Sequence, residues 1–183
     1  MNKKPIFCVL GRSGVGKDSV VNGICKDGQY KVICSYTTRP KRINEGNTHL
    51  FISEEEASKK ENVIAKTEIS GYKYFVTREQ LDGNDFYIID PKGLSDLKSN
   101  EELCKDYEFI AVMIWIPEDI RLQRVRTRGD NPEVAQKRTE SENAQFTTFE
   151  AKAEWDYQIE NTNLADSINK LRTIVKQYGG KNK

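Results

Sequence analysis

The sequence has few of the residues that most often build metal centres and disulfide frameworks. Among its 183 residues are four cysteines, none of them in a C-x-x-C pair, and a single histidine, His49. A structural zinc site or a disulfide framework is therefore not expected. The scattered cysteines are typical of buried thiols in a reducing compartment, and we expect a cytoplasmic protein.

The sequence also lacks an excess of charge of either sign and lacks long apolar runs. Lys and Arg number 29 against 28 Asp and Glu, which gives a net charge of +1. Bulk charge therefore does not favour binding to nucleic acid or to a membrane surface. The longest apolar run, 109–116, is far shorter than the ~18 residues of a membrane-spanning helix. Nothing near the start is typical of a signal peptide. From the balanced charge and the short apolar runs, we expect neither a nucleic-acid partner nor a membrane.

Short apolar runs alternate with longer amphipathic segments, which is typical of an α/β domain with a parallel sheet. Strands are predicted at 6–10, 32–34, 86–89, 109–116 and 157–159, and a small hairpin or two short strands are predicted within 63–76. Helices are predicted at 18–24, from 53 to about 60, from 118 to the break at 129–132, from about 133 to 154, and at 164–178. In the helix that begins near residue 118, the spacing predicts that Leu122 points inward and Arg121 outward.

The strongest chemical signal is the segment 11–17, GRSGVGK, which fits the pattern G-x-x-x-x-G-K between a predicted strand and a predicted helix. The glycines allow backbone N–H groups to surround phosphate oxygens, and the helix N-terminus adds partial positive charge. Lys17 supplies a positive charge near the β- and γ-phosphates. The predicted ATP-binding residues here are Gly11, Ser13, Gly14, Val15, Gly16, Lys17, Asp18 and Ser19.

The residue after the loop lysine is Asp18, at a position where this motif usually has Ser or Thr. A hydroxyl there contacts Mg²⁺, and a carboxylate is also a good hard-oxygen ligand, so Asp18 is the candidate metal residue. The alternative is that Asp18 only interacts favourably with the helix dipole in the first turn.

Further blocks in the same order resemble the guanylate kinase family of nucleoside monophosphate kinases over roughly residues 5–178. The loop is similar to the family's GPSGVGK; the other blocks are SYTTRPKR at 35–42, FISEEEA at 51–57, SGYKY at 70–74, IDPKG at 89–93, RVRTRG at 124–129 with KR at 137–138, and WDYQIEN at 155–161. The resemblance implies a P-loop NTPase three-layer α/β fold with a central parallel sheet. It also implies one domain, 1–183, with a monophosphate-binding insertion at about 35–89 and a lid at about 124–140.

The resemblance implies transfer of the γ-phosphate of ATP to GMP, dGMP or a related nucleoside monophosphate, with Mg²⁺, by a monomer or homodimer. The acceptor-binding residues that it implies are Ser35, Arg39, Arg42, His49, Tyr74 and Asp90. The catalytic residues that it implies are Lys17, Arg39, Arg124, Arg128 and Arg138, and Asn161 is implied at the adenine site. Forked guanidinium groups suit this work because phosphoryl transfer depends on positioning and positive charge.

Three positions depart from the family in the region that holds the acceptor. His49 replaces a tyrosine, Ala65 replaces the base-reading glutamate, and Ile88 replaces the first acid of a D-I-D strand end. Guanine is recognised by groups that accept hydrogen bonds from its N1 and N2, so we expect weaker guanine selectivity unless Glu68 substitutes. The acid lost at residue 88 and the acid gained at Asp18 are interpreted as one exchange on the Mg²⁺ side.

Two alternatives remain at this point. The sequence GKDS at 16–19, with a histidine after a glycine-containing loop, also resembles ribose 1,5-bisphosphate phosphokinases. A non-catalytic binding domain is the other alternative. Such guanylate-kinase-like modules lose the phosphate loop and the lid arginines, and this sequence has both.

Overall fold

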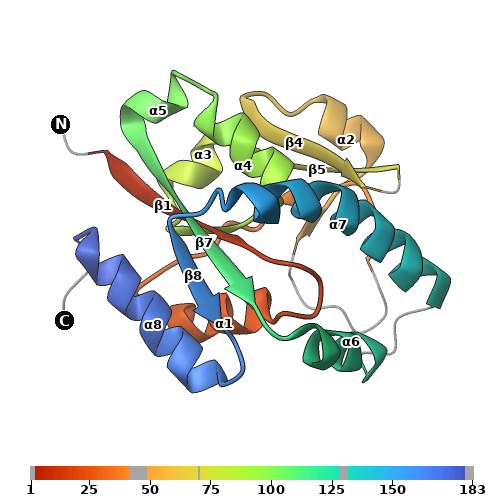
Figure 1. Cartoon of the computed structure of the whole chain (residues 1–183). Helices are drawn as coiled ribbons and strands as arrows, with labels where there is room; N and C mark the ends of the chain where they lie inside the picture. The colour runs from red at the N-terminus through yellow and green to blue at the C-terminus, as the bar shows by residue number, and fades with distance from the viewer. Residues whose placement is uncertain (1–2, 42–48, 70, 128–131, 180–183) are drawn as a thin grey trace.

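A four-stranded parallel sheet lies at the centre of the molecule (Figure 1). The computed structural model describes residues 3–41, 49–69, 71–127 and 132–179. The strand order is β6-β1-β7-β8, with β6 (Phe86–Ile88), β1 (Lys4–Leu10), β7 (Tyr107–Trp115) and β8 (Tyr157–Glu160). Each adjacent pair is parallel, so the carboxyl ends of all four strands lie at one edge.

Alternate side chains of the central strands enter two separate cores. Ile6, Cys8 and Leu10 pack in one buried cluster, whereas Phe7 and Val9 pack in another. This division follows from the two-residue period of a strand, which sends successive side chains to opposite faces of the sheet. A strand that is apolar at every position, as β1 is, must therefore be covered by helices on both sides.

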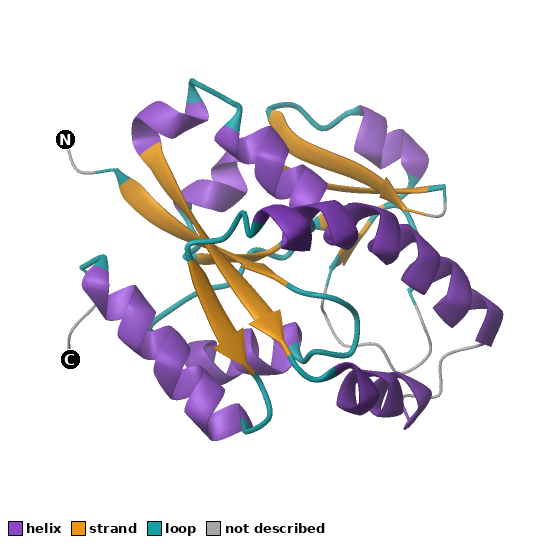
Figure 2. Ribbon diagram, in the orientation of Figure 1, coloured by secondary structure: helices purple, strands orange, loops and turns teal. Residues whose placement is uncertain are grey.

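Helices cover both faces of this sheet and make a three-layer α/β fold (Figure 2). One face is covered by α1 (Lys17–Cys25) and α8 (Leu164–Gln177), and the other by α4 (Pro91–Lys98) and α7 (Pro132–Lys152). The remaining helices are α2 (Glu54–Ser58), α3 (Arg78–Asp82), α5 (Leu103–Asp106) and α6 (Glu118–Thr127). The fold predicted from the sequence is confirmed.

A second, mixed sheet contains the residues of the predicted acceptor region. Its order is β3-β2-β5-β4, with β3 (Leu50–Phe51), β2 (Tyr36–Thr37), β5 (Tyr72–Thr77) and β4 (Val63–Ile69). The antiparallel pair β4–β5 confirms the predicted hairpin. Helix α2 begins with the predicted capping box, in which Ser53 Oγ accepts from the Glu56 amide and Glu56 Oε2 accepts from the Ser53 amide.

Two local predictions are wrong. Residues 32–34 do not form a strand: Val32 makes a single bridge to Phe86, and the Cys34 carbonyl accepts a hydrogen bond from Gln80 Nε2 (2.7 Å) instead of continuing a ladder. In α6, Arg121 is 3% exposed and Leu122 is 36% exposed, the reverse of the predicted orientation. Arg121 turns inward because its polar partners lie there, as described below.

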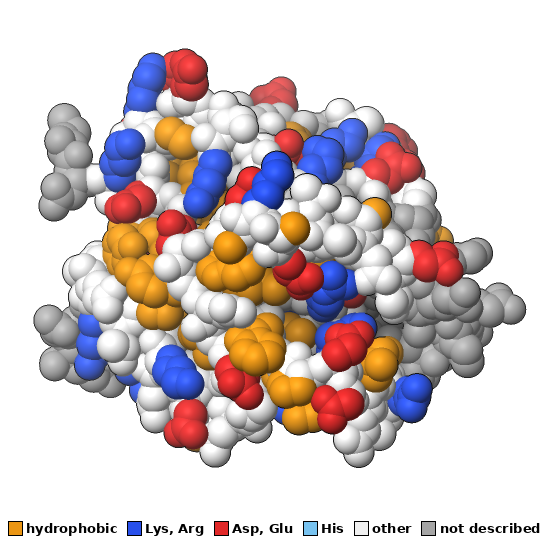
Figure 3. All heavy atoms as spheres, viewed as in Figure 1, with side chains coloured by type: hydrophobic (Ala, Val, Ile, Leu, Met, Phe, Trp, Pro, Cys, Tyr) orange, Lys and Arg blue, Asp and Glu red, His pale blue; other side chains and the backbone are white. Residues whose placement is uncertain are grey.

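Charged side chains of both signs are interspersed on the face shown in Figure 3, which agrees with the balanced composition. Within the described residues, no helix combines the length and the apolar character needed to cross a bilayer.

Candidate active site

The phosphate loop connects the end of β1 to the start of α1, as the sequence predicts. Gly16 caps α1 with φ 88°, in the left-handed region that favours glycine. A Cβ at Gly16 would also lie 2.5 Å from Nδ2 of Asn161. Any side chain at this position would therefore be strained in its backbone and would displace Asn161.

Asn161, which follows β8, fastens this loop from the opposite end of the sequence. Its Nδ2 donates to the Val15 carbonyl (2.8 Å), and its own amide donates to the Trp115 carbonyl (2.8 Å). Asn161 is 3% exposed, and its Oδ1 has no hydrogen-bond partner among the described residues. A buried acceptor without a partner is costly, so this oxygen is suited to accept from an amino group of a ligand.

Lys17 and Arg124, both predicted to be catalytic, lie at the loop. Lys17 Nζ donates to the Gly11 carbonyl (2.6 Å) and is 3.3 Å from the Arg12 carbonyl. Arg124 of α6 donates from Nη2 to the Asn161 carbonyl (3.2 Å). Two of the five predicted catalytic cations are thus brought to one place, where they can neutralise phosphate charge.

Three of the predicted arginines cannot be placed with their side chains. Arg42 and Arg128 lie outside the described residues, and for Arg138 only the backbone, within α7, is described. Their roles stay predictions.

Asp18 and Ser19 are exposed in the first turn of α1, directly after Lys17. The described residues contain no group of three or more His, Cys, Asp or Glu side chains that could hold a metal by themselves. Mg²⁺ commonly takes one or two carboxylates together with substrate phosphates and water. Ile88, where the family has an acid, packs against the core instead. Asp18 therefore offers an exposed carboxylate directly after Lys17, and its role as a magnesium ligand stays a prediction.

One face of the second sheet gathers the predicted acceptor residues. Thr37, Tyr74 and Thr67 are directly paired across β2, β5 and β4, so their side chains share a face. His49 and Ser35 share a hydrogen bond between Nδ1 and Oγ (2.9 Å), and the His49 ring lies edge-on to the Tyr74 ring at 5.6 Å. Imidazole, hydroxyl and phenol are therefore close together, although they come from three separate segments.

Arg39 lies at the edge of this group and is 9% exposed. Its guanidinium carbon is 5.1 Å from the centre of the Phe51 ring, and Nη1 donates to the Pro40 carbonyl (2.9 Å). The contact with an aromatic ring favours the positive charge at this position.

Asp90 begins α4 and connects the acceptor face to the central sheet. Its Oδ1 accepts from the Gly93 amide (2.7 Å) and is 3.5 Å from Oγ1 of Thr67. Because β6 and β1 are adjacent and parallel, Asp90 and the phosphate loop both follow strands at the same edge of the sheet. This is the edge where open α/β sheets bind ligands.

The structure places both residues of the base-reading question. Ala65 is 4% exposed, so this position is buried and apolar. Glu68 is exposed and pairs opposite Lys73, on the face away from Thr67, so its position does not favour a role in place of the missing acid. Thr67 is 7% exposed and is the polar side chain beside Ala65 on the inner face. The sequence analysis missed Thr67, although period-two alternation in 63–69 points to it.

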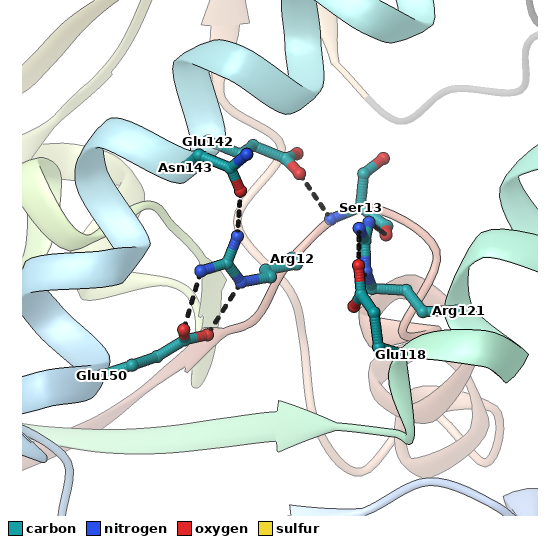
Figure 4. Close-up of polar contacts among 7 residues, drawn as sticks. All are labelled: Arg12, Ser13, Glu118, Arg121, Glu142, Asn143 and Glu150. Atoms are coloured by element: carbon teal, nitrogen blue, oxygen red, sulfur yellow. Dashed lines mark hydrogen bonds and ion pairs between the residues drawn. The ribbon is translucent and has the colours of Figure 1, made fainter.

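Arg121 of α6 is a second missed residue, and it supports the loop from one side (Figure 4). Nη1 donates to the Ser13 carbonyl (3.0 Å), while Nε and Nη2 donate to the two carboxylate oxygens of Glu118 (2.7 and 2.6 Å). The hydrogen bonds that Arg121 donates to Glu118 raise the pKa of Arg121, and the same contact lowers the pKa of Glu118. The buried charge is therefore paired, which explains its inward orientation.

The parallel α/β sheet and the loop between β1 and α1 define a P-loop phosphate-binding protein. The family model "Guanylate kinase" matches residues 2–178. The chain is 30% identical to the guanylate kinase of Thermotoga maritima over 98% of this chain and 89% of that protein. It is 28% identical to that of Mycoplasmoides gallisepticum, over 94% and 92%. The chain belongs to the guanylate kinase family. A crystal structure of guanylate kinase from Anaplasma phagocytophilum shares the fold, with a TM-score of 0.65 at 21% identity over 100% of this chain and 89% of that one.

Proposed function

We propose that this protein is an ATP-dependent kinase that transfers the γ-phosphate of ATP to GMP or dGMP. The observation that carries the proposal is the position of the phosphate loop beside Asp90, at the edge of the sheet from which the acceptor face also extends. Membership in the guanylate kinase family supports the same reaction.

The phosphate loop and the acceptor face have separate tasks in this reaction. The loop amides and Lys17 bind the β- and γ-phosphates, and Asn161 Oδ1 accepts from the adenine amino group. Arg39, which lies over the Phe51 ring, binds the acceptor's phosphate, and Tyr74 adds a hydroxyl. Holding donor and acceptor phosphates in line accounts for much of the catalysis, because phosphoryl transfer requires little covalent help from the protein.

Mg²⁺, held by Asp18 and the nucleotide, would neutralise charge on the β- and γ-phosphates. Arg124 supplies further positive charge from α6. We propose that residues 35–89 form the monophosphate-binding segment and that residues 124–140, with Arg128 and Arg138, form a lid over the phosphates. Together these groups stabilise the charge that spreads over the transferred phosphoryl group.

The test is a coupled assay of ATP consumption with GMP, dGMP, AMP, UMP, dTMP and ribose 1,5-bisphosphate as acceptors. We expect turnover of GMP or dGMP with the highest kcat/KM. Turnover of ribose 1,5-bisphosphate with none of any nucleotide would overturn the proposal in favour of a sugar-phosphate kinase. ATP binding with no turnover of any acceptor would indicate a binding domain. Lys17→Ala is the negative control for contaminating kinases.

A further inference from the structure

Helix α7 holds the phosphate loop through Arg12, at the loop position where the family motif has proline (Figure 4). Arg12 Nε and Nη2 donate to the two carboxylate oxygens of Glu150 (2.9 and 2.7 Å). Nη1 also donates to Oδ1 of Asn143, and the guanidinium carbon is 5.7 Å from the centre of the Phe146 ring. A forked ion pair, an amide and an aromatic ring thus fix this helix against the loop.

This attachment brings a carboxylate onto a phosphate-binding amide. Glu142, two turns before Glu150 on α7, accepts a hydrogen bond at Oε2 from the Ser13 backbone N–H (2.9 Å). Ser13 belongs to the loop whose amides bind nucleotide phosphate in proteins of this type. A carboxylate and a phosphate oxygen compete for the same donor, because both are anionic acceptors.

The positive charges nearest Glu142 are already paired with other carboxylates. Arg12 is paired with Glu150, and Arg121 is paired with Glu118 (Figure 4). Withdrawal of the Glu142 carboxylate would therefore remove one negative charge from the neighbourhood of an approaching phosphate.

We propose that Glu142 is an internal competitor of ATP at the phosphate loop, and that Arg12 is the positioning residue that holds its helix in place. The inference rests on the proposed function for the identity of the ligand. ATP must displace Glu142 from the Ser13 amide to use that amide. By reciprocity, the free energy with which Glu142 opposes ATP equals that with which ATP weakens the contact between α7 and the loop.

The test measures the Kd of a non-hydrolysable ATP analogue by isothermal titration calorimetry. Glu142→Gln removes the charge but keeps the size, and we expect it to bind the analogue about three- to tenfold more tightly than wild type. In steady state the KM for ATP falls and kcat at saturating ATP is retained, a split that a purely structural role would not produce. Glu150→Gln and Arg12→Lys each weaken the forked ion pair between α7 and the loop. Each is expected to lower the Kd of the analogue by less than Glu142→Gln does.

Glu154→Gln is the matched control, because it makes the same change of charge just beyond α7, where Glu154 lies 3.6 Å from Lys152 and is not joined to the loop. Its Kd should equal that of wild type. An unchanged or weaker affinity in Glu142→Gln, with an unchanged Tm, overturns the inference. Failure of the proposed function is distinguishable, since it would appear as wild-type protein that binds the analogue but does not phosphorylate GMP.

Discussion

The proposed ATP half of the site, the phosphate loop, and the proposed acceptor half, beside the second sheet, are built in different ways. The ATP half is a continuous loop with the motif G-x-x-x-x-G-K, whose backbone amides and glycines suit phosphate binding. The acceptor half is made of side chains such as Ser35, His49 and Tyr74, which come from separate segments in and beside the second sheet. Backbone amides are present whatever side chain a residue has, so the loop holds Arg12 and Asp18 where the family motif has other residues and still keeps its glycines and its lysine. In a pocket built of side chains, one substitution changes what is recognised, as at His49 and Ala65.

The largest loss of activity is expected when the positive charge of Lys17 is removed from the ATP half. Lys17→Ala should lower kcat/KM by about 10²–10³-fold, because a preorganised positive charge on the phosphates is lost. Lys26→Ala, at the exposed end of the same helix, is the matched control and should keep full activity. Full turnover by a folded Lys17→Ala protein would refute the assignment of the loop.

A change at Arg39 should affect the acceptor half and not the ATP half. Arg39→Ala should raise the KM for GMP about tenfold or more and change the KM for ATP little, because the guanidinium is proposed to bind the acceptor's phosphate. Arg39→Lys keeps the positive charge but cannot donate two parallel hydrogen bonds to the phosphate, so it should recover little of the lost affinity for GMP. Arg78→Ala, which removes an exposed pair with Asp106, is the control. A rise in the KM for ATP alone would mean that the two halves are assigned the wrong way round.

Selectivity for guanine should increase when a carboxylate is restored at residue 65. Ala65→Glu should raise the ratio of kcat/KM for GMP over AMP by about tenfold, because a base without the matching hydrogen-bond donors would leave this carboxylate unpaired. Because residue 65 is buried, the unliganded variant should also lose about 1–3 kcal/mol of stability, seen as a lower Tm that GMP partly restores.

Thr67→Val is the complementary variant and should lower the same ratio. If both variants leave the GMP-to-AMP ratio unchanged, the inner face of β4 does not read the base.

The smallest expected effect concerns the support of the loop by α6. The hydrogen bond from Arg121 lowers the pKa of Glu118 below its ordinary 4.5. Because the pKa of Glu118 is lower in the folded state than in the unfolded state, the pair stabilises the fold at pH values above the unfolded-state pKa. This stabilisation is lost as the pH falls through the folded-state pKa. Glu118→Gln should therefore lower Tm slightly at neutral pH, with the difference shrinking on acidification. Asp119→Asn, in the same turn, is the comparison, and an equal pH response in both would contradict this assignment.

The sequence predicted features whose causes are local and could not predict those with distant causes. The phosphate loop and the capping box of Ser53 and Glu56 depend on residues within one turn, and both formed where predicted. Arg121 was assigned outward because helical periodicity cannot register a partner such as the Ser13 carbonyl, 108 positions away. Gln80, 46 positions from Cys34, likewise donates a hydrogen bond to the Cys34 carbonyl, and the strand predicted at 32–34 does not form. The short helices α3, α4 and α5 were not anticipated, although Thr77 and Gln80 at the start of α3 have the spacing of a capping box, as Ser53 and Glu56 do at α2.

The contact between Asn161 and the Val15 carbonyl has a consequence for the order of folding during synthesis. The two residues are 146 positions apart, so the loop emerges from the ribosome long before the side chain that fastens it. A contact of such long range closes only after most of the chain is available. The nascent protein is therefore expected to acquire a nucleotide-competent loop late, as one of the last regions to become ordered.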